Sequence, residues 1–216
     1  MTAVRFRSVI LDVDSTLSGI EGIDWLAGRR SVEVAAQVAA LTERAMAGEI
    51  TLDQVYDSRL QLVQPSRGDC LALGHAYAEA VAPGATETIH ELRAAGVDIY
   101  LVSGGIRNAI VHFAATLGLQ EQRVHAVQVH FDVSGNYRDF DRASPLTSQS
   151  GKASVVAALM MAKPVLAVGD GATDAAMKPV VDCFAAFTGF VHRENVVQHA
   201  DRVFRSFRDL SAAVLS

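Results

Sequence analysis

Three short runs of β-branched and apolar residues recur along the chain, and each ends abruptly in polar or small residues. They cover residues 8–11, 97–102 and 165–168. Apolar runs of this length are typical of strands buried in a parallel sheet. Helical patterns precede the second and third runs, over residues 85–95 and 153–161. The alternation of strand and helix predicts an α/β fold with a Rossmann-like parallel sheet covered by helices.

Residues 18–80 have a different pattern, without a convincing strand. Segments 31–47 and 52–62 have helical periodicity. Because this stretch follows the first expected strand, we predict a small helical cap inserted at that point. The chain would then consist of a discontinuous core, residues 1–17 and 81–216, and a cap of residues 18–80.

Further elements are expected after the second strand. Residues 124–138 alternate between apolar and polar positions and include Ser134-Gly-Asn, which predicts a β-hairpin. Residues 106–117 and 207–215 have helical patterns. Ser206 is suited to cap the second of these helices.

Composition narrows the classes of function. Half of the 216 residues are hydrophobic and 20% are charged, which is enough apolar material for a packed core. The net charge is −5 and no cluster of Lys and Arg occurs, so we expect no nucleic-acid partner. No signal peptide and no transmembrane run is expected, and hence no membrane partner. Cys70 and Cys183 have no metal-like spacing, which favours reduced thiols and a cytoplasmic location, while the oligomeric state stays open.

Acidic residues follow the first and third expected strands. Asp12 and Asp14 follow the first, and side chains at positions i and i+2 of an extended chain point to one side. Asp170 and Asp174 follow the third, where flanking glycines allow close approach of a ligand. Either pair alone is usually a surface turn, but the carboxyl ends of parallel strands converge. Together they supply the hard oxygen ligands that Mg²⁺ prefers.

Two further features favour an anion. Ser103, Gly104 and Gly105 end the second strand and precede a helix, whose free N–H groups would attract negative charge. Lys152 follows a glycine at the start of another expected helix. A plain glycine turn and a solvated lysine are the alternative interpretations.

The order of these motifs resembles that of the haloacid dehalogenase superfamily, most members of which are Mg²⁺-dependent phosphoryl-transfer enzymes. The motifs are Asp12-x-Asp14-x-Thr16, the strand ending in Ser103, Lys152, and Gly169-Asp170-Gly-x-x-Asp174. Further motifs resemble the phosphoserine phosphatase family within it. These are Glu21-Gly-Ile-Asp24, Arg44-Ala-Met46-x-Gly48, Arg59-Leu and Gln64-Pro-Ser66. The resemblance covers about residues 8–201.

The resemblance implies roles for the residues at the strand ends. Asp12 would attack phosphorus and form an aspartyl-phosphate, and Asp14 would act as general acid and then as general base. Mg²⁺ would be held by Asp12, Asp170 and the backbone carbonyl of Asp14. The remaining implied contacts are to the substrate, through Ser103, Gly104, Gly105, Lys152 and Thr173, with Asp174 supporting Lys152 or the metal shell.

The resemblance also implies a substrate, O-phospho-L-serine, which would be hydrolysed to L-serine and phosphate in the last step of serine biosynthesis. Substrate choice would lie in the cap. Glu21 would bind the ammonium group, Arg59 would bind the carboxylate through two hydrogen bonds, and Met46 would line the pocket.

Two alternatives stay open on the sequence alone. The first is a phosphatase or phosphotransferase of the same fold acting on another small phosphomonoester, for example by phosphate transfer to homoserine. The second is a non-catalytic binding module. The complete set of Asp12, Asp14, Lys152 and Asp170 argues against the second, because a binder needs neither a nucleophile nor an acid.

Overall fold

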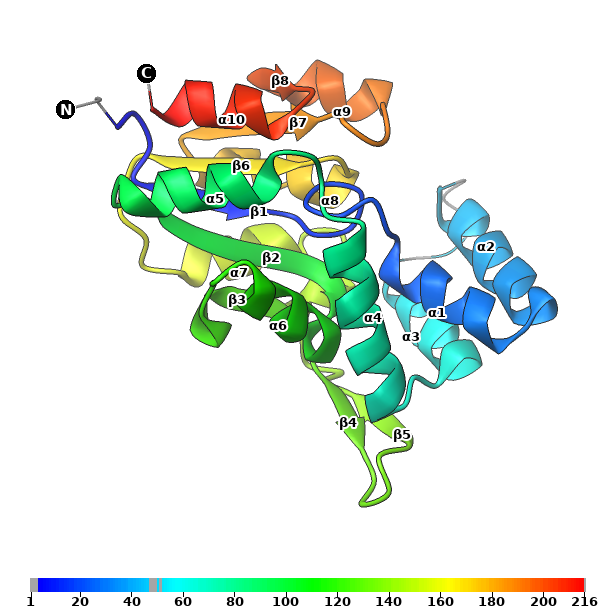
Figure 1. The fold of residues 1–216 in the computed structure, drawn as a ribbon. Coiled ribbons are helices and arrows are strands. Elements are labelled where there is room, and N and C mark those ends of the chain that lie inside the picture. The colour runs from blue at the N-terminus through cyan, green and yellow to red at the C-terminus, as the bar shows by residue number, and fades with distance from the viewer. Residues whose placement is uncertain (1–3, 47–49, 51, 216) are drawn as a thin grey trace.

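The computed structural model describes residues 4–46, 50 and 52–215, without the side chains of residues 43, 45, 46, 52 and 53. Its centre is a parallel six-stranded sheet with the order β3-β2-β1-β6-β7-β8, flanked by helices (Figure 1). The strands are β1 (Ser8–Leu11), β2 (Asp98–Ile106), β3 (Val124–Val127), β6 (Val165–Gly169), β7 (Cys183–Phe187) and β8 (Arg202–Phe204). The strand order changes direction between β1 and β6. The predicted α/β fold is therefore confirmed, and this switch point is where ligands bind in such sheets.

The register of the sheet explains why distant motifs meet. Leu11, the last residue of β1, lies opposite Leu101 of β2 and Val168 of β6. The residues that follow these three positions therefore emerge at the same edge of the sheet. This edge carries the polar motifs that the sequence places after each strand.

The helices around the sheet match most of the predicted segments. They are α5 (Ala85–Ala94), α6 (Arg107–Thr116), α7 (Gly151–Ala158), α8 (Ala172–Ala175), α9 (Glu194–His199) and α10 (Phe207–Val214), with short 3₁₀ turns η1 (Glu121–Arg123), η2 (Pro145–Thr147) and η3 (Lys178–Val180). Ser206 caps α10 as predicted, because its hydroxyl accepts a hydrogen bond from the Asp209 amide. No helix of the described residues has the length and apolar character needed to span a bilayer.

Four helices lie between β1 and α5, and Figure 1 shows them grouped on one side of the sheet. They are α1 (Gly22–Arg30), α2 (Val32–Met46), α3 (Leu52–Val63) and α4 (Arg67–Glu79). The sequence pattern predicts α2 and α3 but not α1 or α4. Ser66 and Asp69 form a reciprocal capping box that begins α4.

The predicted hairpin over residues 124–138 is only partly right. Its first part, Val124–Val127, is the edge strand β3 and pairs in parallel with β2. The hairpin consists instead of β4 (Val129–Phe131) and β5 (Tyr137–Phe140), which pair antiparallel. Val124 and Val127 are buried, so this short apolar segment extends the main sheet.

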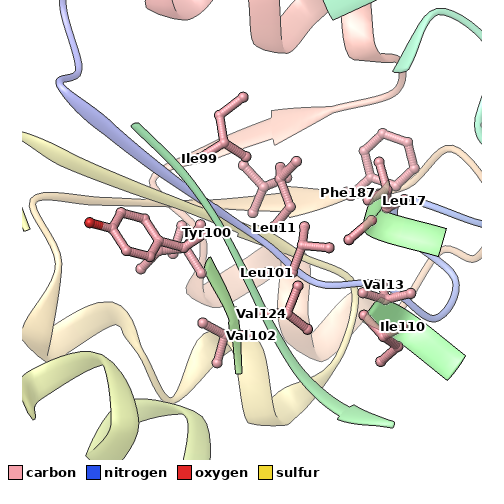
Figure 2. Packing of buried hydrophobic residues seen from close by; sticks show 14 of the residues in the cluster. Leu11, Val13, Leu17, Ile99, Tyr100, Leu101, Val102, Ile110, Val124 and Phe187 are labelled. Carbon is pink, nitrogen blue, oxygen red and sulfur yellow. The ribbon is translucent and has the colours of Figure 1, made fainter. Parts of the chain in front are cut away.

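The core positions the first motif. Every residue of β1 is buried, which is why Val9, Ile10 and Leu11 are all apolar without alternation. Leu11, Val13 and Leu17 belong to one buried cluster with residues of β2 such as Leu101, and Figure 2 labels these four residues. Because Val13 points into this core, Asp12 and Asp14 on either side of it are directed away from the core and toward the edge of the sheet.

Candidate active site

Three carboxylates meet at the switch point of the sheet. Asp12 follows β1, Asp170 follows β6, and Asp174 lies in α8, and all three are buried. One oxygen of each lies within 4.8 Å of the others. Asp12 and Asp170 thus come together across more than 150 residues of sequence, as the parallel sheet predicts. Their geometry is compatible with a bound divalent metal.

Lys152 connects two of these carboxylates. Its side chain is 5% exposed, and Nζ lies 2.7 Å from Asp12 Oδ1 and 2.7 Å from Asp174 Oδ1. Burial disfavours the ammonium form, but the two adjacent carboxylates offset this and raise the pKa of Lys152. Gly151 allows the close approach of α7 to η2, because a Cβ there would overlap the carbonyl of Pro145. Because its pKa is raised, Lys152 is a charged residue within the site.

Asp174 is held from two sides. Its Oδ1 accepts the hydrogen bond from Lys152, and its Oδ2 accepts one from the Gly171 amide at 3.0 Å. Burial and the nearby negative charge of Asp12 raise the pKa of Asp174 to about 7, although Lys152 opposes this. Both of its oxygens are engaged, so its position suits a supporting role.

Asp14 lies in a different environment from Asp12. Its Oδ1 accepts hydrogen bonds from the Gly22 amide at 2.6 Å and from the Tyr77 hydroxyl at 2.7 Å. Burial, followed by the negative charges of Glu21 and Asp12, raises the pKa of Asp14 to about 7, while these hydrogen bonds oppose the shift. At neutral pH this carboxyl group is therefore able both to give and to take a proton.

Asp170 is oriented by two neighbours. Its Oδ1 accepts a hydrogen bond from Thr16 Oγ1 at 3.1 Å, and its Oδ2 forms an ion pair with Arg193 Nη1. Arg193 precedes α9, more than 20 residues after Asp170. The sequence pattern assigns no role to Arg193 or to Tyr77. In the sequence, Arg193 resembles an ordinary surface arginine and Tyr77 resembles an apolar helix residue. No local feature therefore identifies either as a site residue.

The carboxylates face a cavity of about 290 Å³. The predicted site residues that line it are Asp12, Asp14, Glu21, Arg59, Gly104, Gly105, Lys152, Asp170, Thr173 and Asp174. Ser103 is fully buried beside them, and its hydroxyl accepts a hydrogen bond from the Gly105 amide at 2.9 Å. The predicted contact of Met46 falls on a side chain outside the described residues. The described site residues therefore gather around one cavity.

The side of the cavity formed by the inserted helices carries both signs of charge. Glu21 precedes α1 and accepts a hydrogen bond from Ser15 Oγ at 2.7 Å. Arg59 of α3 forms an ion pair with Asp24 through Nη2. A small molecule with an ammonium and a carboxylate group would find a partner for each.

Comparison with known proteins identifies the class. The sequence model of the haloacid dehalogenase-like hydrolase family matches residues 6–177 of this chain. The chain therefore belongs to this class of hydrolases. The similarity to the relatives described below shows that it is a phosphoric monoester hydrolase.

Within that class, the chain belongs to the phosphoserine phosphatase family. It is 35% identical over 206 residues to phosphoserine phosphatase from Rattus norvegicus, covering 94% of this chain and 91% of that one. The same identity and coverage hold for the enzyme from Homo sapiens. A solved phospho-aspartyl intermediate analogue of phosphoserine phosphatase has a TM-score of 0.78 and 25% identity, with 96% of this chain and 98% of that chain covered.

Proposed function

We propose that this protein hydrolyses O-phospho-L-serine to L-serine and phosphate. One observation carries the proposal: a single cavity is lined by Asp12 and Asp14 together with the oppositely charged Glu21 and Arg59. The substrate has three charged groups. Its negatively charged phosphate would bind beside Lys152. Its ammonium group is complementary in charge to Glu21, and its carboxylate is complementary to Arg59.

The reaction would proceed in two displacements on Asp12. In the first, a carboxylate oxygen of Asp12 bonds to phosphorus while the bond from phosphorus to the serine oxygen breaks. Asp14 gives its proton to that leaving oxygen, which the raised pKa of Asp14 makes available near neutral pH. Lys152 holds Asp12 Oδ1 and so fixes the orientation of the nucleophile. The product of this step is L-serine and an aspartyl-phosphate.

The second displacement releases phosphate. Asp14, now ionised, takes a proton from a water molecule as that water attacks phosphorus. The bond from phosphorus to Asp12 then breaks, and Asp12 returns to its carboxylate form. Asp14 is protonated again, so both residues are ready for another turnover.

We assign Mg²⁺ as the metal of this site. The buried oxygens of Asp12 and Asp170 are the hard ligands that Mg²⁺ prefers, and the backbone carbonyl of Asp14 is the proposed third. When bound, Mg²⁺ reduces the repulsion between the anionic nucleophile and the anionic phosphate. Asp174 is assigned to support, because Lys152 and a backbone amide already occupy its two oxygens.

The binding groups divide between two parts of the chain. We assign phosphate binding to Lys152 together with Ser103, Gly104, Gly105 and Thr173 of the core, residues 1–17 and 81–216. Residues 18–80 are the proposed cap, in which Glu21, Arg59 and Met46 select the substrate. The grouping of α1 to α4 on one side of the sheet supports this division (Figure 1).

The proposed location is the cytoplasm. Cys70 and Cys183 are both free thiols buried in the structure. Unpaired cysteines are the usual state in a reducing compartment.

Phosphate release across a panel of phosphomonoesters tests the proposal. With Mg²⁺ present, we expect O-phospho-L-serine to be hydrolysed far faster than the others, and Asp12→Asn to abolish turnover of all of them. Arg59→Ala should reduce turnover of O-phospho-L-serine much more than that of p-nitrophenyl phosphate. A different ester far ahead of the rest, or phosphate transfer to an added alcohol in place of release, would contradict the assigned reaction.

A further inference from the structure

Two of the buried polar atoms that lack a partner in the described residues belong to residues that line the cavity. In the described part of the chain, four buried side-chain nitrogen or oxygen atoms lack a hydrogen-bond partner: Tyr56 Oη, Arg59 Nε, His125 Nε2 and Tyr137 Oη. Buried polar groups are normally paired, so each of these calls for a partner from elsewhere. Tyr56 and Arg59 both line the active cavity. They lie three residues apart on α3, and therefore share one face of that helix.

Tyr56 is firmly placed. It is 6% exposed, and its ring packs edge-on against Phe140 of β5, with the ring centroids 5.4 Å apart. Burial strongly raises the pKa of the phenol, and Arg59 and Asp14 are the next influences on it. Tyr56 lines the cavity together with Asp14 and Arg59, and its phenol keeps its proton, so its hydroxyl is able to donate a hydrogen bond.

The described protein groups nearby are already engaged. Asp24 pairs with Arg59, and Asp14 accepts hydrogen bonds from Gly22, Tyr77 and, at 3.5 Å, Ser103. An acceptor supplied by a bound molecule would satisfy Tyr56 without breaking these contacts. The positive charge of Arg59 on the same helix face favours a carboxylate as that acceptor.

We propose that the hydroxyl of Tyr56 donates a hydrogen bond to the substrate carboxylate, beside Arg59, and so is a specificity-determining residue. This inference rests on the proposed function. A substrate without the carboxylate leaves the hydroxyl orphaned in the complex as well as in the free protein. Sites built to hydrogen-bond a group discriminate strongly against analogues that lack it.

The test is Tyr56→Phe, measured on two substrates that differ only in the carboxylate. O-phospho-L-serine carries it, and O-phosphoethanolamine has the same phosphate and ammonium groups without it. We expect Tyr56→Phe to lower kcat/KM for O-phospho-L-serine by about tenfold, mainly through KM, because hydrogen bonds to charged groups are strong. The value for O-phosphoethanolamine should stay unchanged.

Tyr137→Phe is the matched control. Its hydroxyl is also buried and unpaired among the described residues, but Tyr137 does not line the cavity. This variant should leave kcat/KM unchanged for both substrates. Equal losses on both substrates with Tyr56→Phe, or no loss on either, would overturn the inference.

Thermal unfolding separates binding from a merely structural role. Without ligand, Tyr56→Phe should unfold at the same temperature as the parent or higher, because an orphaned hydroxyl does not stabilise the fold. Added L-serine, which carries the carboxylate, should raise the unfolding temperature of the parent more than that of Tyr56→Phe. A lower unfolding temperature without ligand and an equal shift with L-serine would assign Tyr56 to packing and overturn the inference. Absence of O-phospho-L-serine turnover by the parent would refute the proposed function itself, whereas turnover unaffected by Tyr56→Phe would refute only this inference.

Discussion

Replacing Lys152 with methionine separates the structural and chemical parts of the site. Lys152 lies 2.7 Å from a carboxylate oxygen of both Asp12 and Asp174, and all three side chains are buried. Methionine retains the length and apolar character of the lysine stem but removes its charge. Lys152→Met therefore leaves two adjacent buried carboxylates without their common partner.

The expected loss follows from that geometry. Removing one partner of a buried ion pair costs about 3–5 kcal/mol, because a charge stays buried and uncompensated. For a chain of this length, 1 kcal/mol corresponds to roughly 2–4 °C in the unfolding temperature. We therefore expect Lys152→Met to unfold about 6–20 °C below the parent, and to lose phosphatase activity as well.

The loss should depend on pH. Without the lysine, which lowers it, the folded-state pKa of Asp174 rises further above that of the unfolded chain. A group whose pKa is raised by folding stabilises the fold at low pH, and this contribution disappears as pH rises through the folded-state pKa. The deficit of Lys152→Met should therefore be small near pH 5 and large near pH 8.

Circular dichroism melts in the presence of a metal chelator measure this effect. Lys178→Met is the matched control, because Lys178 Nζ also lies 2.7 Å from a carboxylate, that of Asp201, but its side chain is 43% exposed. Such a surface pair is worth at most about 1 kcal/mol. If the two variants melt at the same temperature at pH 8, Lys152 does not hold the site together in the way its contacts indicate.

Three further predictions concern other parts of the site. Asp24→Asn releases Arg59 from its ion pair. KM for O-phospho-L-serine should therefore rise severalfold, while KM for O-phosphoethanolamine stays constant. An equal change in both KM values would show that Asp24 does not position Arg59. Gly151→Ala places a methyl group against the Pro145 carbonyl, so steady-state activity should fall. The free energy of unfolding, measured by urea titration, should drop by roughly 1–3 kcal/mol. An unfolding midpoint equal to that of the parent would contradict this packing. The pKa of Asp14 is about 7 in the folded state, above its ordinary value, so the metal-free protein should lose roughly 2–4 kcal/mol of stability between about pH 4 and 7 from this group. Asp14→Asn should flatten the slope, and an unchanged slope would place that pKa elsewhere.

The convergence of the acidic motifs could be predicted because it depends on a general property of parallel sheets. Asp12 and Asp170 each follow a buried strand, and the carboxyl ends of neighbouring parallel strands share an edge. The contact of Lys152 with Asp12 depends in addition on how α7 packs against η2. No local pattern encodes that packing.

Other features depend on pairing between distant segments. Tyr77 reaches Asp14 only because α4 packs beside the loop after β1, and Arg193 reaches Asp170 from the loop before α9. Likewise, residues 124–127 have the same alternation as a hairpin strand, but the neighbouring β2 draws them into the main sheet. Which strands pair in a sheet depends on residues far apart in the sequence, and this explains why the predicted hairpin is only partly right.

Helices α1 and α4, which the sequence pattern does not predict, have weak local patterns. The segment that forms α1 contains Gly22 and Gly28, and the segment that forms α4 contains Gly68 and Gly74. Glycine disfavours an isolated helix, so these segments rely on packing for their structure.

The proposed mechanism requires Asp12 to carry the phosphoryl group during turnover. The most direct measurement is to quench the protein in acid during hydrolysis of O-phospho-L-serine labelled on phosphate, and to locate the label by peptide mass spectrometry. We expect a phosphorylated peptide modified at Asp12, and no label on a folded Asp12→Asn variant. Label on another residue, or rapid phosphate release with none on Asp12 at any quench time, would contradict it.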